Sequence, residues 1–190
     1  MAIEQHFYMD TTAARHELRD VLIDAGLGFQ AQPDWQTPSG RSGSGAINEA
    51  TVVSILDDLG YRNSRPDNGV IATRSITFRD RRAYLTKPEH EGQYDRDVTL
   101  GVMALLRAYP EADAYWDSYD AEIPTLLRRE GRLVLAQALT ENNEQWDAER
   151  QPYRAMVDLP YVVEPLGPWP NVSNESYVPY DPAAEGHRET

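Results

Sequence analysis

The side chains that could do chemistry in this sequence do not fall into the spacing of a recognised catalytic or metal-binding motif. His16-Glu17 begins like the helix of a zinc protease, but position 20, where the second imidazole would stand, is aspartate. Asp95-Arg96-Asp97 resembles the Asp-x-Asp of some metal sites, and Asp57-Asp58 could add oxygen ligands, although helix capping is the simpler interpretation of the first pair. The four histidines are scattered, and the Gly-x-Ser-x-Gly turn of serine hydrolases is missing. We therefore predict no enzyme activity, no cofactor and no resident metal.

A second candidate is the Pro-, Ser- and Gly-rich stretch of residues 32–45. A phosphate-binding loop is the more specific interpretation of residues 39–45, but the Gly-Lys-Ser/Thr that begins the helix of a P-loop is missing. Gly40, Gly43 and Gly45 lie so close together that we expect no regular element to persist there. The pattern predicts a mobile loop.

Composition and charge narrow the class of function. The chain has 190 residues, enough for one domain, and no cysteine, which excludes disulfides, thiolate nucleophiles and Cys-based zinc sites. Its 31 acidic and 18 basic residues give a formal net charge of −13, which would repel nucleic acid and anionic lipid and favour a basic partner. The simpler alternative is that surplus acid keeps the protein in solution. Because signal-peptide features and a run of roughly 20 apolar residues are both missing, we expect a soluble cytoplasmic protein with no membrane contact.

Two segments gather carboxylates around aromatic side chains, and this combination suits a protein interface because charge steers encounter and rings anchor contact. The first places Glu111, Asp113, Asp117, Asp120 and Glu122 around Tyr115, Trp116 and Tyr119, and the second places Glu141, Glu144, Asp147 and Glu149 around Trp146. Core positions for both tryptophans, and a merely solvated edge of carboxylates, are the more ordinary alternative. The residues that we expect to bind a partner are Asp113, Asp117, Tyr119, Asp120 and Glu122, followed by Glu144 and Asp147.

Hydrophobic periodicity predicts the elements that position these residues. Alternation favours strands over residues 3–9, 70–80, 112–120, 123–128 and 132–136, the last two joined by a turn at Glu130-Gly131. Helical spacing favours one helix over residues 12–25, capped by Asp10 or Thr11. A second helix begins at a cap at Asp95, with Asp97 at the positive end of the dipole, and Pro110 prevents its continuation. Its buried stripe is Val98, Val102, Leu105, Leu106 and Tyr109. Residues 49–59 could form either helix or strand.

The C-terminal part of the chain has a different composition. A short helix is expected within residues 144–157, and six prolines mixed with aromatic residues follow Leu159. We therefore expect a single α+β domain over residues 1–160, a mainly antiparallel sheet with two principal helices on one face. Residues 161–190 are expected to form an extended Pro-rich tail that packs on the domain and is frayed at its end.

Several stretches of the C-terminal half resemble immunity proteins of the Sit type, which are encoded beside polymorphic toxins in bacteria. The matching residues are Arg96-Asp97-Val98, Leu105 to Pro110, Asp113-Ala114, Leu126 to Leu135, Trp146 and Leu159-Pro160-Tyr161. The resemblance implies a small acidic cytoplasmic protein that neutralises a cognate toxin by occluding its active site and does no chemistry of its own. It assigns no individual residue to the interface. We expect a monomer or weak homodimer.

Two other classes of function stay open at this point. An acidic nucleic-acid mimic or anti-restriction protein would share the acid excess, but should space its carboxylates regularly along an elongated body. An enzyme with an unrecognised metal site would draw its carboxylates from Asp95 and Asp97 and should place them together in a pocket.

Overall fold

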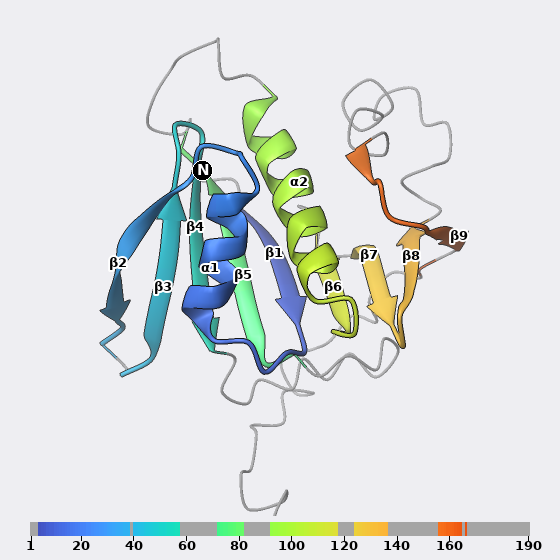
Figure 1. Cartoon of the computed structure of the whole chain (residues 1–190), viewed down its shortest axis with the longest axis horizontal. Helices are drawn as coiled ribbons and strands as arrows, with labels where there is room; N and C mark the ends of the chain where they lie inside the picture. Colours follow the sequence, from blue (N-terminus) through green and yellow to red (C-terminus); the bar gives the residue numbers. More distant parts are fainter. Residues whose placement is uncertain are drawn as a thin grey trace, which may run out of the picture.

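In the computed structural model the described part of the chain forms a nine-stranded sheet with two helices on one face (Figure 1). The structure describes residues 4–38, 40–57, 72–81, 92–117, 124–136, 156–164 and 166. The elements in chain order are β1 (Glu4–Met9), α1 (Arg15–Asp24), β2 (Gln30–Gln36), β3 (Ser42–Ile47), β4 (Thr51–Asp57), β5 (Arg74–Asp80), α2 (Gln93–Ala108), β6 (Ala114–Asp117), β7 (Pro124–Arg129), β8 (Arg132–Ala136) and β9 (Val162–Glu164). The predicted α+β class, with a mainly antiparallel sheet and both helices on one face, is confirmed.

The strands lie in the order β2-β3-β4-β5-β1-β6-β7-β8-β9, so the first strand of the chain is central. β1 runs antiparallel to both β5 and β6, which are therefore parallel to each other and are connected through α2. The remaining neighbours are antiparallel, except that β9 is parallel to β8. α1 connects β1 to the distant edge strand β2 and packs mainly over β3 and β4.

The core lies between the sheet and the two helices. Phe7 and Met9 of β1 alternate with half-buried residues and are fully covered, as two-residue periodicity predicts. The predicted stripe of α2 is buried from Val98 to Leu106, whereas Tyr109 packs at the margin of the core. Gly101 lets this helix approach closely, since an added Cβ would lie 3.1 Å from Phe78 Cε1 and 3.2 Å from Leu22 Cδ2. Neither helix in the described part of the chain has the length and apolar character to cross a bilayer.

Both helices are found where they were predicted, but their caps differ. α1 begins after Ala14, whose backbone N–H donates to Glu17 Oε2 at 2.7 Å, so neither Asp10 nor Thr11 is its cap. α2 begins after Gly92, which has the left-handed φ of 80° that glycine adopts without strain. Asp95 therefore lies within the first turn and is not the cap.

The expected mobile loop over residues 32–45 is wrong, because most of this stretch belongs to β2 and β3. The indole of Trp35 lies across β3, and a Cβ on Gly43 would be 2.5 Å from Trp35 Cε2. A Cβ on Gly45 would be 2.7 Å from Val53 O and 2.9 Å from Trp35 Cζ3. The glycines thus make room for a ring and a neighbouring strand, a role that strand glycines often have.

The other predicted elements are found in the described residues. The ambiguous residues 49–59 contain strand β4. The hairpin between β7 and β8 turns at Glu130 and Gly131, with φ values of 51° and 75°, which suits the two-residue turn that matches strand twist. The start of the tail forms β9, and the expected short helix lies mostly outside the described residues. The division of the chain at residue 160 stays a prediction.

Candidate functional site

Asp97, one of the two candidate metal ligands, is part of a buried polar network and does not serve the helix dipole as predicted. Its side chain is only 2% exposed, and its Oδ2 accepts hydrogen bonds from Asn48 Nδ2 at 2.7 Å and Thr51 Oγ1 at 3.0 Å. Loss of water around the carboxyl raises its pKa, and the two hydrogen bonds oppose that rise only in part. The carboxyl joins α2 to the turn between β3 and β4.

Asn48 is the centre of this network. Its Nδ2 also donates to Leu27 O at 2.9 Å, and its Oδ1 accepts from the backbone N–H of Ala50 at 3.0 Å and of Thr51 at 2.8 Å. One amide side chain therefore holds the β3–β4 turn, the segment after α1 and the first turns of α2. Because four protein groups satisfy this amide, the arrangement is suited to holding the fold together.

The carboxylates proposed for an unrecognised metal site do not converge. Asp95 Oδ1 accepts from Gln5 Nε2 on β1 at 3.4 Å, whereas Asp97 is directed to the β3–β4 turn. Asp57 lies at the end of β4 among arginine side chains. Across the residues that the structure describes, no group of three or more metal-ligating side chains is found.

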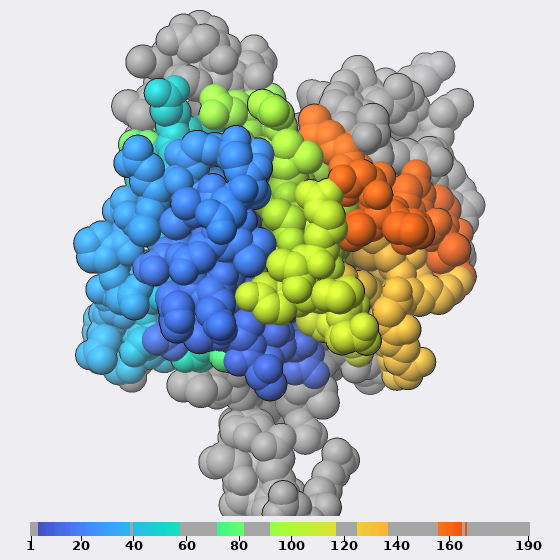
Figure 2. Space-filling model, viewed as in Figure 1, coloured from blue at the N-terminus to red at the C-terminus, as the bar shows by residue number. Residues whose placement is uncertain are grey.

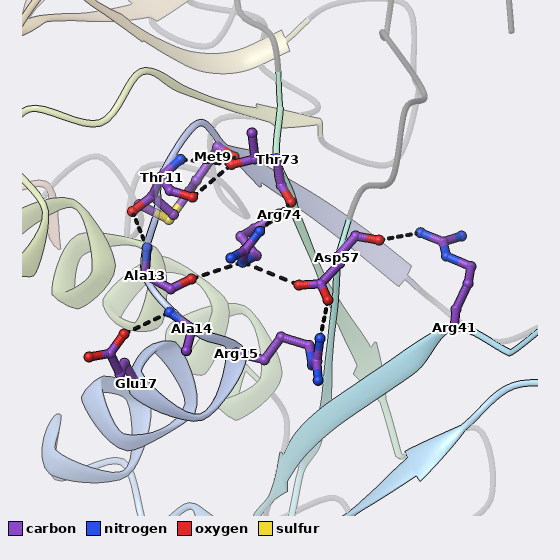
Figure 3. A network of polar contacts seen from close by, with 10 residues as sticks. All are labelled: Met9, Thr11, Ala13, Ala14, Arg15, Glu17, Arg41, Asp57, Thr73 and Arg74. Atoms are coloured by element: carbon purple, nitrogen blue, oxygen red, sulfur yellow. Dashed lines mark hydrogen bonds and ion pairs between the residues drawn. The ribbon is translucent and has the colours of Figure 1, made fainter. Parts of the chain in front are cut away.

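Figure 3 shows the surroundings of Asp57, which the sequence did not reveal. Its carboxylate pairs with Arg15 at the start of α1 and with Arg74 Nε at 3.4 Å, and its backbone oxygen accepts from Arg41 Nη2 at 2.7 Å. Arg74 Nε also donates to Ala13 O at 2.9 Å. These contacts tie α1, β3, β4 and β5 together at one end of the sheet. No local pattern could have revealed them, since the partners are 16 to 61 residues apart.

Arg128, part of the stretch that carries the family resemblance, is buried and terminates α2. Its guanidinium donates to three backbone oxygens, Leu106 O at 2.6 Å, Ala112 O at 2.7 Å and Tyr109 O at 2.5 Å. The last carbonyls of a helix have no partner within the helix, and a cation there also suits the negative end of the dipole. Burial lowers the pKa of Arg128, and the nearby Asp113 and Glu111 oppose this change.

The aromatic residues of the first acidic segment are buried. Trp116 is 5% exposed, and its Nε1 donates to Gln5 Oε1 at 3.0 Å, so the core alternative is correct for this tryptophan. Tyr115, which we expected among the aromatic residues of an interface, is fully covered and stacks on Tyr8 with ring centroids 4.5 Å apart. Trp146 lies outside the described residues. Trp116 and Tyr115 therefore do not form an exposed aromatic anchor.

Of the residues predicted to bind a partner, the structure describes Asp113 and the backbone of Asp117. Asp113 is half-buried, and its Oδ1 accepts from the backbone N–H of Glu130 at 2.8 Å. Asp117 ends β6 opposite His6 of β1. The others, Tyr119, Asp120, Glu122, Glu144 and Asp147, lie outside the described residues.

The fold brings further carboxylates close to Asp113. Asp10 donates its backbone N–H to Asp113 O at 2.8 Å, and burial raises the pKa of Asp10, with the charge of Asp113 adding to this rise. Glu111, two residues before Asp113, and Glu130, in the turn between β7 and β8, are both exposed. We call Asp10, Glu111, Asp113 and Glu130 the acidic corner. Sequence reasoning missed Asp10 and Glu130, because only strand pairing brings them to this place.

Comparisons with known proteins give no identification. No family model, no curated protein and no solved structure matches the chain. The site must therefore be interpreted from its own geometry.

That geometry divides the polar side chains into two groups. Asp97, Asn48, Asp57 and Arg128 are held by several protein partners each and stabilise the scaffold. The acidic corner faces solvent, and three of its members, Asp10, Glu111 and Glu130, are exposed. It can present negative charge to another molecule, and nothing in its arrangement resembles an acid–base pair directed at a common point.

Proposed function

We propose that this chain is a cytoplasmic immunity protein that neutralises a cognate toxin by binding it and covering its active site. It performs no chemistry in this role. The partner is a basic protein domain, and the complex is non-covalent and stoichiometric.

The acidic corner is the observation that carries the proposal. Three separate segments, the end of β1, the approach to β6 and the β7–β8 turn, contribute carboxylates to one place. Asp113 belongs both to this corner and to the residues that carry the family resemblance. In a chain of net charge −13, such a surface would attract a basic cleft over long range and speed encounter with it.

The same surface supplies a mechanism of inhibition. Toxins that act on nucleic acids or nucleotides bind phosphates through Arg and Lys, and carboxylates could replace those phosphates at the cleft. An occluding protein needs a rigid surface rather than a reactive one, because preorganisation reduces the entropic cost of binding. The sheet and the buried networks of Asn48 and Arg128 supply that rigidity.

The first experiment is co-expression with the toxin encoded beside this gene. Cells that carry the toxin should grow only when this chain is present, and purified chain should bind the toxin in a one-to-one complex. If the neighbouring protein kills equally well with and without the chain, the immunity function is wrong.

A charge-reversal pair then locates the surface. Glu111→Lys with Glu130→Lys changes two exposed members of the acidic corner, and Asp20→Lys with Asp24→Lys makes the same change of net charge on the exposed side of α1. The first pair should slow association at low salt by about tenfold or more, and the second pair much less. Equal effects from both pairs would show that net charge alone matters and that the acidic corner is not the binding surface.

A further inference from the structure

We call residues 156–164 the strap. This segment lies at the β8 edge of the sheet and is separated in the sequence from the residues of the acidic corner. It packs partly buried Val157, Leu159 and Tyr161 against the main core and then adds β9 to the edge of β8. Figure 1 shows it on the β8 side of α2, and Figure 2 shows it as an orange layer on the outer surface next to β8. The strap is thus the outermost layer on this side of the described sheet.

The attachment of the strap is thin. β9 has three residues and pairs in parallel, which is slightly less stable per residue than antiparallel pairing. Val162 and Val163 are 39% and 38% exposed and are the exposed large hydrophobic side chains among the described residues.

Two ion pairs, Arg107–Asp158 and Arg132–Glu164, complete the attachment, and the exposed fractions of their side chains run from 42% to 57%. Ion pairs this exposed to water and salt contribute little. On its other side β8 is held by an antiparallel hairpin with four paired positions and a two-residue turn.

We infer that the strap detaches from β8 as a unit while the rest of the sheet stays folded. Its release leaves β8 as an edge strand of the described sheet. The strap is therefore a conformational device that covers this edge in the closed state. This inference does not depend on the acidic corner or on the identity of a toxin.

Alternate amides of β8 report the two sides of the strand separately. Arg129 and Arg132 flank the two-residue turn and form its hydrogen-bonded closing pair, so the next such pair is Leu127 with Val134. The amide of Leu135 consequently faces β9 and lies within the paired register of the two strands, which begins at Val134. One strand thus contains both a reporter of strap release, Leu135, and a matched control, Val134.

Native-state hydrogen exchange of the full chain tests the inference. The amide of Leu135 should exchange at least about a hundredfold faster than those of Leu127 and Val134, because only Leu135 is freed when the strap opens. Equal protection of all three amides would show that β8 and β9 open only together with the sheet, and would overturn the inference.

Two variants separate strap release from general loosening. Asp158→Asn with Glu164→Gln weakens both ion pairs and should speed exchange at Leu135 by about two- to tenfold, without a change at Leu127 and Val134.

Since the chain has no cysteine, Val134→Cys with Val162→Cys provides one unambiguous cross-link between directly paired positions. The oxidised form should slow exchange at Leu135 to the rate at Leu127, whereas reduction should restore the difference. Val162→Cys alone is the control. Fast exchange that persists in the cross-linked protein would overturn the inference.

Discussion

The effect of Gly43→Ala on stability should depend on the residue at position 35. The substitution should destabilise the protein that has Trp35 and stabilise a Trp35→Ala variant. In the native protein the new Cβ would lie 2.5 Å from Trp35 Cε2 and 2.6 Å from Cζ2. Carbon atoms pack best at about 3.5–4.0 Å, so the ring must move by roughly 1 Å or leave its place on β3. Gly43 has no positive φ, and its backbone therefore accepts alanine without strain.

The magnitude follows from two opposing contributions. Overpacking of a fitted site costs about 1–3 kcal/mol, while replacing glycine within a strand stabilises by about 0.5–1 kcal/mol through the unfolded chain. Gly43→Ala should therefore lower the free energy of unfolding by up to about 2 kcal/mol when Trp35 is present. In a Trp35→Ala background the ring is gone, and the same change should stabilise by about 0.5–1 kcal/mol.

Urea denaturation followed by far-ultraviolet circular dichroism measures the four members of this cycle, with equal m values as the check on two-state behaviour. Gly45→Ala is the matched control, because its Cβ would also meet Val53 O at 2.7 Å. It should destabilise in both backgrounds. If Gly43→Ala destabilises equally with and without Trp35, the ring does not occupy this place and our account of β2 and β3 is wrong.

Two further predictions concern the buried networks. Asp97→Asn keeps an oxygen acceptor for Asn48 and Thr51 but does not titrate. Folding raises the pKa of Asp97, so ionising this carboxyl costs more in the folded protein than in the unfolded chain. As pH rises from about 4, the free energy of unfolding of the native protein should therefore fall relative to that of the variant, by no more than about 1.4 kcal/mol per pH unit, and then level off. Urea denaturation at several pH values measures the difference, and a difference that grows with pH contradicts the argument. Arg128→Met removes the side-chain donor to three backbone oxygens, of which Tyr109 O keeps the N–H of Ala112, and should lower the free energy of unfolding by about 2–4 kcal/mol. Arg129→Met at the exposed neighbouring position should change it by less than about 0.5 kcal/mol in thermal denaturation, and similar losses for both variants would refute the capping role.

The elements that sequence reasoning predicted correctly are those whose cause is local. Two-residue alternation predicts β1, 3.6-residue spacing predicts α1 and α2, and Glu130-Gly131 predicts the hairpin. Each of these patterns lies within the segment that forms the element. The sequence alone also sufficed for the α+β class.

The errors concern residues whose partners are remote. Gly43 resembles a loop residue until Trp35 is placed on it, and Asp97 resembles a helix-dipole residue until Asn48, 49 positions away, donates to it. Periodicity within β6 could not show that Tyr115 stacks on Tyr8, since the contact depends on which strand lies next to which. Pairing information across the sheet was needed for all three.

Fewer carboxylates are available to bind a partner than the formal net charge suggests. Asp97 is enclosed, Asp57 is paired with arginine, and Asp113 is half engaged because the hairpin turn donates to it. Reversing the charge at Asp113 would therefore loosen the β7–β8 turn as well as remove a charge, and the two effects on binding could not be separated. Glu111 and Glu130 are exposed, so changes at their side chains test charge with the least disturbance of the fold. A binding defect that arises only at Asp113 would indicate that the shape of the hairpin, and not the electrostatic attraction of the acidic corner, is what a partner recognises.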